Sequence, residues 1–333
     1  MNFKRFTNSI LGAVAATLTA SSVLAADKVV YQLDWLPGGD KAPIYVCIQQ
    51  GFCAEAGLDV TISQGRGSSD AITKIATGAS DIGSAGIGAL MAAKVSEDVP
   101  VKAVMSLFNK GPHAFYTLKG NGIEVLGDVK GKKIATSPFT ASNVYLPLVL
   151  ADNGMSEADI ELTKADPGAL GPMLMTGNTD AIIAWLTDVT RYTDQAKEAG
   201  KEIAYLPWSD AGLMLYSSSI VASEKFLSER PDVAKRFVTA FKKSVEFAAA
   251  NTAKAAQDVA TMVPELDAAG VEGSLKDALV LVFNDVTEKD GLGVFESERL
   301  AATWSRVSQA QGLDPEALDP EMLVDRSVLA SAE

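Results

Sequence analysis

Short apolar runs alternate along this chain with segments whose apolar residues recur at helical spacing. This alternation is typical of βαβ units, and it predicts an α/β fold with mainly parallel sheets. The runs that we interpret as strands lie at 29–35, 58–63, 81–84, 101–107, 133–136, 162–165 and 181–185. Helices are expected at 42–50, 69–77, 140–150 and 168–176, with a long amphipathic helix at 233–248.

The alternation restarts after a loop at 120–131 that contains four glycines. A chain of 333 residues also exceeds the size at which single hydrophobic cores stop growing. We therefore expect two Rossmann-like lobes, the first formed by residues 26–116 and 217–333 and the second by the inserted residues 117–216. The chain would cross between the lobes at 113–118 and again at 214–220, and these two crossing strands would form a hinge beside a cleft.

The first 25 residues have the pattern of a secretion signal. Lys4 and Arg5 precede an apolar stretch at 9–25, and Val23 and Ala25 place small residues where a signal peptidase cleaves. A membrane anchor is the alternative, but the stretch is rich in Ala, Ser and Thr and is too weakly apolar to span a bilayer. We expect cleavage near Ala25 and a soluble protein exported to the periplasm.

The charge of the exported chain argues against two classes of partner. Loss of Lys4 and Arg5 leaves 27 of the 29 basic residues against 42 acidic ones, a net charge of −15. Such a chain is repelled by phosphates and anionic lipids, which disfavours nucleic acid and membrane surfaces as main partners. We expect a monomer without a cofactor, whose partner is a small molecule.

Cys47 and Cys53 are the only cysteines. In an oxidising compartment they could form a disulfide. A continuous helix would hold them on diverging faces, whereas a break at Gly51 would allow the bond to close, so both states stay open. Two thiols and the single histidine, His113, are too few for a usual metal site.

Candidate ligand-binding residues follow the predicted strands, because ligands of α/β sheets bind beyond the carboxyl ends of strands and at helix N-termini. In the first lobe these are Asp34, Trp35, Lys41, Tyr45, Arg66, Ser68, Ser69 and Gly86. In the second lobe they are Ser137, Phe139, Thr140, Ser142, Asn143, Trp185, Asp188 and Asp210.

Structural roles remain open for several of these residues. Ser68 and Ser69 could be helix caps, and the two tryptophans could be core residues. Asp188 and Asp210 could be surface charges or could pair with Lys41 or Arg66.

Several segments resemble one known family. They are 34–37 (DWLP), 45–46, 51–52, 57–60 (GLDV), 67–70 (GSSD), 77–78, 81–83 (DIG), 126–133, 176–177, 180–181 and the return strand. The chain is similar to periplasmic substrate-binding proteins of ABC importers in the thiamine-pyrimidine-precursor-binding group, related to the taurine, alkanesulfonate and nitrate binding proteins. The resemblance implies the type II periplasmic binding fold, no catalysis, and a ligand site that includes Trp35, Tyr45, Ser68, Ser69, Gly86, the 137–143 segment and Trp185.

The chain also departs from that family. Members that bind the thiamine pyrimidine often carry Asn, His and Gly where this chain has Gly38, Lys41 and Pro43, so the resemblance does not extend to that ligand. Cys53 replaces a usual aromatic residue, which favours pairing with Cys47.

We expect a protein that closes about its hinge over a small organic ligand and delivers it to the membrane permease of an ABC importer. Aromatic walls suit a heterocycle or an aromatic ligand, and Lys41, Arg66 and the helix start near Asn143 favour a small carboxylate, a sulfonate or an electron-rich heterocycle. The alternatives are an exported sensory protein and a pyrimidine-synthase-like enzyme on the same fold. No nucleophile motif accompanies His113, so we expect no catalysis.

Overall fold

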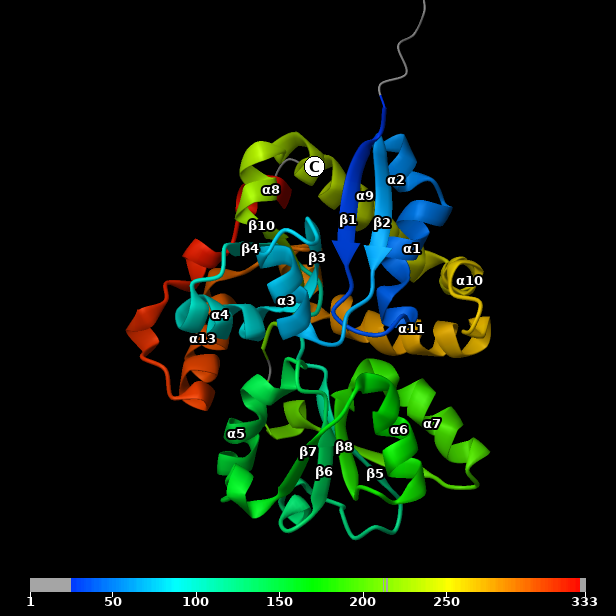
Figure 1. Ribbon diagram of the computed structural model, residues 1–333, viewed down its shortest axis with the longest axis vertical. Helices are drawn as coiled ribbons and strands as arrows, with labels where there is room; N and C mark the ends of the chain where they lie inside the picture. Colours follow the sequence, from blue (N-terminus) through cyan, green and yellow to red (C-terminus); the bar gives the residue numbers. More distant parts are fainter. Residues whose placement is uncertain (1–24, 212, 214, 330–333) are drawn as a thin grey trace, which may run out of the picture.

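The structure is a computed structural model that describes residues 25–211, 213 and 215–329. The predicted secretion signal lies outside the described residues, apart from Ala25. The chain forms two lobes, each built around its own five-stranded sheet with helices packed on both faces (Figure 1).

The first sheet has the strand order β2-β1-β3-β10-β4. β1 runs parallel to both β2 and β3, and β10 runs antiparallel to β3 and β4. Every residue of β3 and β10 is buried, because helices cover both faces of the sheet. The strands of this sheet are β1 (Asp27–Gln32), β2 (Leu58–Ser63), β3 (Ile82–Gly86), β4 (Val101–Ser106) and β10 (Ser218–Ser223).

The second sheet repeats this plan with the order β7-β6-β8-β5-β9. β6 is parallel to β7 and β8, and β5 is antiparallel to β8 and β9. Its strands are β5 (His113–Leu118), β6 (Lys133–Thr136), β7 (Glu161–Lys164), β8 (Ala181–Trp185) and β9 (Ile203–Pro207).

The first crossing between the lobes lies earlier in the chain than predicted. The segment expected to cross, 113–118, is β5, which pairs only with strands of the second sheet, so the predicted boundary after residue 116 falls inside a strand. The crossing segments are instead 107–112 and, on the return, the residues just before β10, of which 215–217 are described. They hydrogen-bond to each other, since Ser217 N donates to Phe108 O at 2.9 Å and Phe108 N donates to Ser218 O at 2.9 Å. Local apolar patterning predicts that a strand exists, but which sheet it joins depends on distant partners.

The predicted long helix is α9 (Pro231–Ala250), which begins at a proline whose missing N–H costs nothing in the first turn. Its apolar face packs on β1, where Tyr31 stacks on Phe237 and Phe241 with ring centroids 5.7 and 5.9 Å away. Among the described helices, none has both the length and the apolar character to cross a membrane. The other helices are α1 (Ala42–Gln49), α2 (Phe52–Glu55), α3 (Ser68–Ala76), α4 (Ile87–Glu97), α5 (Ser142–Asp152), α6 (Pro167–Thr176), α7 (Val189–Glu198), α8 (Glu224–Glu229), α10 (Thr252–Met262), α11 (Ala268–Val282), α12 (Asp285–Asp290), α13 (Ser297–Gln311) and α14 (Arg326–Leu329).

A disulfide joins Cys47 and Cys53, with the two Cα atoms 5.1 Å apart. Gly51 makes this possible because its φ of +79° ends α1 and turns the chain into α2. Both cysteines are buried in the first lobe, away from its boundary with the second.

Replacing both cysteines with alanine is expected to lower the free energy of unfolding by about 2 kcal/mol, the loop-closure entropy for so short a loop. Urea denaturation of the oxidised protein and the double variant measures this difference. Ligand affinity should stay within about 2-fold, because neither cysteine lies at the lobe boundary. A loss of binding with unchanged stability would contradict this structural role.

Candidate functional site

A narrow cavity lies between the two lobes, at the carboxyl ends of strands from both sheets. Neither lobe forms it alone. The first lobe contributes Asp34, Trp35, Asp40, Gly67 and Ser68, and the second lobe contributes Thr140, Ala184, Trp185, Thr187 and Asp188. We call this space the interlobe cavity.

The lobes touch at the rim of the interlobe cavity through the loops that precede α3 and α5. Ser69 N donates to Phe139 O at 3.1 Å, and Ser137 Oγ donates to Arg66 O at 2.9 Å. Two glycines allow this close approach: a Cβ on Gly67 would lie 2.2 Å from the Phe139 carbonyl carbon, and a Cβ on Gly86 would lie 2.7 Å from the Cβ of Ala141. These contacts describe a closed form.

The lobes also touch along α11, which runs along the side of the first lobe that faces the second (Figure 1). Ser274 Oγ donates to Thr187 O at 2.6 Å. Asp277 accepts from both the backbone N and the hydroxyl of Thr190, at 3.2 and 2.8 Å, at the start of α7. The cavity residues Thr187 and Asp188 are therefore held by a helix of the other lobe.

A buried ion cluster lies beside the cavity in the first lobe. Lys41 Nζ is 2.6 Å from Asp34 Oδ1 and 2.8 Å from Asp40 Oδ2, and the lysine is only 5% exposed. Ser84 Oγ also donates to Asp34 at 2.8 Å. Burial opposes the charged form of Lys41, but the two carboxylates outweigh it and raise the pKa of the ammonium above its ordinary value. The charge of Lys41 is thus neutralised by two aspartates that lie close to it in the sequence.

The second lobe places one more buried carboxylate on the cavity wall. Asp188 is paired with Arg191, whose Nη1 lies 3.0 Å from Oδ1. Burial raises the pKa of Asp188 above its ordinary value, against the opposing effect of Arg191.

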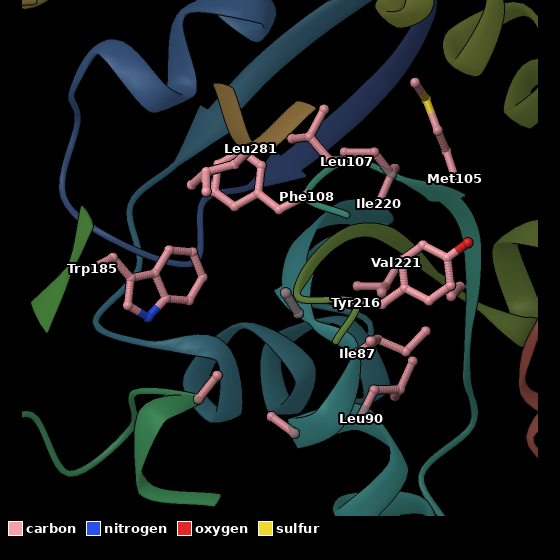
Figure 2. Packing of buried hydrophobic residues seen from close by; sticks show 14 of the residues in the cluster. Ile87, Leu90, Met105, Leu107, Phe108, Trp185, Tyr216, Ile220, Val221 and Leu281 are labelled. Carbon is pink, nitrogen blue, oxygen red and sulfur yellow. The ribbon is translucent and has the colours of Figure 1, made fainter. Parts of the chain in front are cut away.

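Two indole rings supply the aromatic part of the cavity. Trp185 is 9% exposed, and its ring meets Phe108 edge-on with centroids 6.0 Å apart (Figure 2). The ammonium of Lys41 lies 5.6 Å from the centroid of Trp185. Trp35 Nε1 is buried and has no hydrogen-bond partner among the described residues, so it is a donor available to a ligand.

Six of the sixteen predicted ligand-binding residues line the interlobe cavity: Asp34, Trp35, Ser68, Thr140, Trp185 and Asp188. Lys41 lies behind them in the ion cluster. Arg66, Ser69, Gly86, Ser137 and Phe139 form contacts between the lobes instead. Ser142 is fully buried and contacts the indole nitrogen of Trp185.

Three predicted residues have other roles. Tyr45 packs into the core of the first lobe. The amide of Asn143 donates to Ser137 O at 2.8 Å and accepts from Thr136 at 3.0 Å, so it holds its own loop together. Asp210 is exposed and lines a separate groove beside Glu124.

Four residues of the cavity wall were not among the predicted ones: Asp40, Gly67, Ala184 and Thr187. Asp40 and Gly67 belong to loops that were recognised, and Thr187 follows Trp185 by two positions. Their positions just after the ends of strands are the sequence feature by which they could have been predicted. Ala184 carries no chemistry that would distinguish it in the sequence.

Comparisons with known proteins agree with this architecture. The model of the "NMT1/THI5 like" family matches residues 39–255. A putative thiamine biosynthesis protein of Haemophilus influenzae is 27% identical over 88% of this chain and 90% of its own. A formylaminopyrimidine-binding protein of Halalkalibacterium halodurans is 24% identical over 83% of this chain and 82% of its own.

Two further relatives bear on fold and on catalysis. The alkanesulfonate-binding protein SsuA of Xanthomonas axonopodis pv. citri, solved with MOPS bound, superimposes with a TM-score of 0.71 over 91% of this chain and 99% of its own, at 17% identity. This likeness confirms the expected periplasmic binding fold. A 4-amino-5-hydroxymethyl-2-methylpyrimidine phosphate synthase of Saccharomyces cerevisiae is 26% identical over 73% of this chain and 74% of its own.

Proposed function

Because the chain belongs to the NMT1/THI5-like family, we propose that it is a periplasmic solute-binding protein that captures a small, flat organic molecule and delivers it to the permease of an ABC importer. The observation that carries this proposal is the interlobe cavity, which exists only while residues of both lobes are in contact. Opening of the lobes would admit the ligand, and closing would bury it.

Size and lining favour a flat ligand. The free space in this closed form is only about 10 Å³, room for about one water molecule, so a ligand must be thin and must enter while the lobes are apart. Trp35 and Trp185 border it from opposite lobes, and indole faces stack well on planar rings.

The charges of the site favour a ligand with N–H donors over an anion. Asp34, Asp40 and Asp188 present three carboxylates to the interlobe cavity. Their counter-ions, Lys41 and Arg191, are already paired with them. In the sequence, Lys41 and Asn143 favoured a carboxylate or sulfonate ligand. In the structure Lys41 pairs with two aspartates, and Asn143 hydrogen-bonds to its own loop.

Arg66 was the other cation that favoured an anionic ligand, but its side chain is engaged elsewhere. Its side chain is 55% exposed, lies 3.6 Å from Asp70 and covers the ring of Phe139 at 4.8 Å. An anionic ligand would therefore meet surplus negative charge. We propose a heterocycle with amino or ring N–H donors, and with at least one acceptor for the Trp35 N–H.

Catalysis is not part of this proposal. The single histidine, His113, lies outside the cavity lining, and burial lowers its pKa to about 3. Within the described residues, no cluster of His, Cys, Asp or Glu could hold a metal ion. We propose a monomer that needs no cofactor, and a sensory role remains the alternative because receptor and permease would recognise the same closed form.

A thermal-shift screen tests the ligand class. Aminopyrimidines and related heterocycles should raise the melting temperature, since ligand at about 100 times Kd adds about 2.7 kcal/mol to the free energy of unfolding. Alkanesulfonates and simple carboxylates should give no shift. Stabilisation by sulfonates alone would refute the ligand class, and no shift with any compound would refute the binding function.

Replacing Trp35 with phenylalanine is expected to weaken binding of the best compound about 10-fold, because an aromatic face stays while the unpartnered N–H and the second ring of the indole are removed. Isothermal titration calorimetry measures the change. The melting temperature of the free variant should fall only slightly, since removal of an unsatisfied donor offsets part of the packing lost with the smaller ring. Asn143→Ala is the contrasting control: it should lower the melting temperature and leave the ligand shift intact.

A further inference from the structure

Three buried residues from three elements form a hydrogen-bonded chain behind the cavity wall. Trp185 Nε1 lies 3.3 Å from Ser142 Oγ, and Ser142 Oγ lies 2.9 Å from His113 Nδ1. Trp185 ends β8, Ser142 begins α5, and His113 begins β5. His113 and Trp185 also face each other across the antiparallel pair of β5 and β8. Ser142 is fully buried and His113 is 3% exposed, so water does not replace these bonds.

The chemistry of the three groups fixes the direction of the chain. An indole N–H can only donate, so Ser142 Oγ accepts from Trp185. The hydroxyl has a single proton left to donate, and of its two remaining neighbours His113 Nδ1, at 2.9 Å, is nearer than Thr140 Oγ1, at 3.4 Å. This direction requires an unprotonated Nδ1, which is the neutral ring with its proton on Nε2. Burial lowers the pKa of His113 to about 3, which keeps the ring neutral at physiological pH.

The indole of Trp185 needs such a partner to hold one orientation. Its other neighbours are the rings of Phe108, at 6.0 Å, and of His113, at 5.8 Å and nearly perpendicular, and the ammonium of Lys41, at 5.6 Å. The indole N–H itself donates to Ser142 Oγ. The χ2 angle of tryptophan is broad, and a rotated ring would leave its N–H buried without an acceptor. The bond to Ser142 therefore selects the observed ring orientation.

We propose that His113 is a positioning residue that acts through Ser142 to hold the Trp185 indole with its face on the interlobe cavity. This inference rests on the proposed function only in assuming that the cavity binds a ligand. The orientation of the ring is a property of the unliganded closed protein, and it can be measured without any ligand.

The test compares two substitutions of nearly equal shape, His113→Asn and His113→Leu. The asparagine Oδ1 replaces Nδ1 as an acceptor, whereas leucine has the same branching and no acceptor. The measurement is hydrogen exchange at the indole nitrogen, followed by NMR on full-length exported protein with ¹⁵N-labelled tryptophan. Only four tryptophans are present, and Trp185→Phe assigns the signal.

In the native protein and in His113→Asn, the Trp185 signal should be single and protected from exchange. In His113→Leu, it should split or broaden, or exchange at least about 10-fold faster. Ser142→Ala removes the central hydroxyl and should give the same result as His113→Leu. If the leucine variant does not fold, His113→Gln, whose polar group extends past the Nδ1 position, should show the same loss.

An unchanged, protected Trp185 signal in His113→Leu or Ser142→Ala overturns the proposal, and so does equal loss in the asparagine variant. The signals of Trp35 and Trp304 report general unfolding, and they should stay unchanged, whereas Trp208 should shift because its ring lies 5.7 Å from that of His113. If no compound binds in the thermal-shift screen, the binding function fails while this measurement still decides the role of His113.

Discussion

Replacing Lys41 with methionine is expected to lower the free energy of unfolding by about 3–5 kcal/mol, because it removes one partner of a buried ion cluster. The change leaves Asp34 and Asp40 buried beside the interlobe cavity without the ammonium that lies within 2.8 Å of both. Urea denaturation followed by circular dichroism measures the loss. Ligand binding should fall as well, because the same carboxylates line the cavity.

The matched control is Lys74→Met. Lys74 is 2.9 Å from Asp70, a distance similar to those in the buried cluster, but its side chain is 34% exposed. Water screens such a pair, so the expected loss is below about 1 kcal/mol. Adding Asp34→Asn and Asp40→Asn to Lys41→Met should recover most of the stability, since the uncompensated charges are gone. Equal losses for the two lysine variants would show that the ion cluster is not energetically special.

Replacing Gly86 with alanine is expected to weaken ligand binding about 10- to 100-fold. The φ of Gly86 is −67°, which alanine adopts without strain. The new Cβ would lie 2.7 Å from the Cβ of Ala141 in the other lobe, so the penalty falls on the closed form. Overpacking of this kind costs about 1–3 kcal/mol. Affinity falls with the fraction of closed, binding-competent protein.

A second substitution separates steric blocking from other effects. Ala141→Gly removes the atom that the new side chain meets, so the Gly86→Ala/Ala141→Gly protein should bind nearly as tightly as the native one. Calorimetry gives the affinities, and small-angle X-ray scattering should show a larger radius of gyration for Gly86→Ala in the presence of ligand. Native affinity in Gly86→Ala, or no recovery in the double variant, would mean that closure does not bring these two positions together.

The sequence predicts local features of this fold well. The predicted limits of three strands, 58–63, 133–136 and 181–185, are those of β2, β6 and β8. Glycine-containing turns and short apolar runs define such strands without reference to the rest of the chain. β9 was not among the predicted strands, although its sequence IAYLP is a short apolar run; it is an edge strand whose residues are only partly buried. The segment 113–118 was expected to cross between the lobes; its place in the second sheet depends on pairing with β8 and β9, which follow much later in the chain.

For the candidate site, the positions of residues were predictable from the sequence, but the partners of their side chains were not. Asp34 and Trp185 were identified because position after a strand end places a residue at the cavity. The directions of polar side chains were not predictable, since each depends on which partner is nearest in space. Lys41 turns to two carboxylates near it in sequence, and Asn143 turns to the carbonyl of Ser137. Because these groups are paired within the protein, they are not free to bind an anion, and the prediction of an anionic ligand loses its support.

The position of β10 has a consequence for how the molecule is made. β10 lies between β3 and β4, and among the described strands it is the only one that pairs with β4. During synthesis the ribosome completes the entire second lobe before it reaches Ser218. The N-terminal sheet therefore waits, with two strand edges unpaired, for a segment that begins more than a hundred residues after β4 ends at Ser106. Contacts so distant in sequence form slowly, so the first sheet stays incomplete until the whole second lobe has been synthesised.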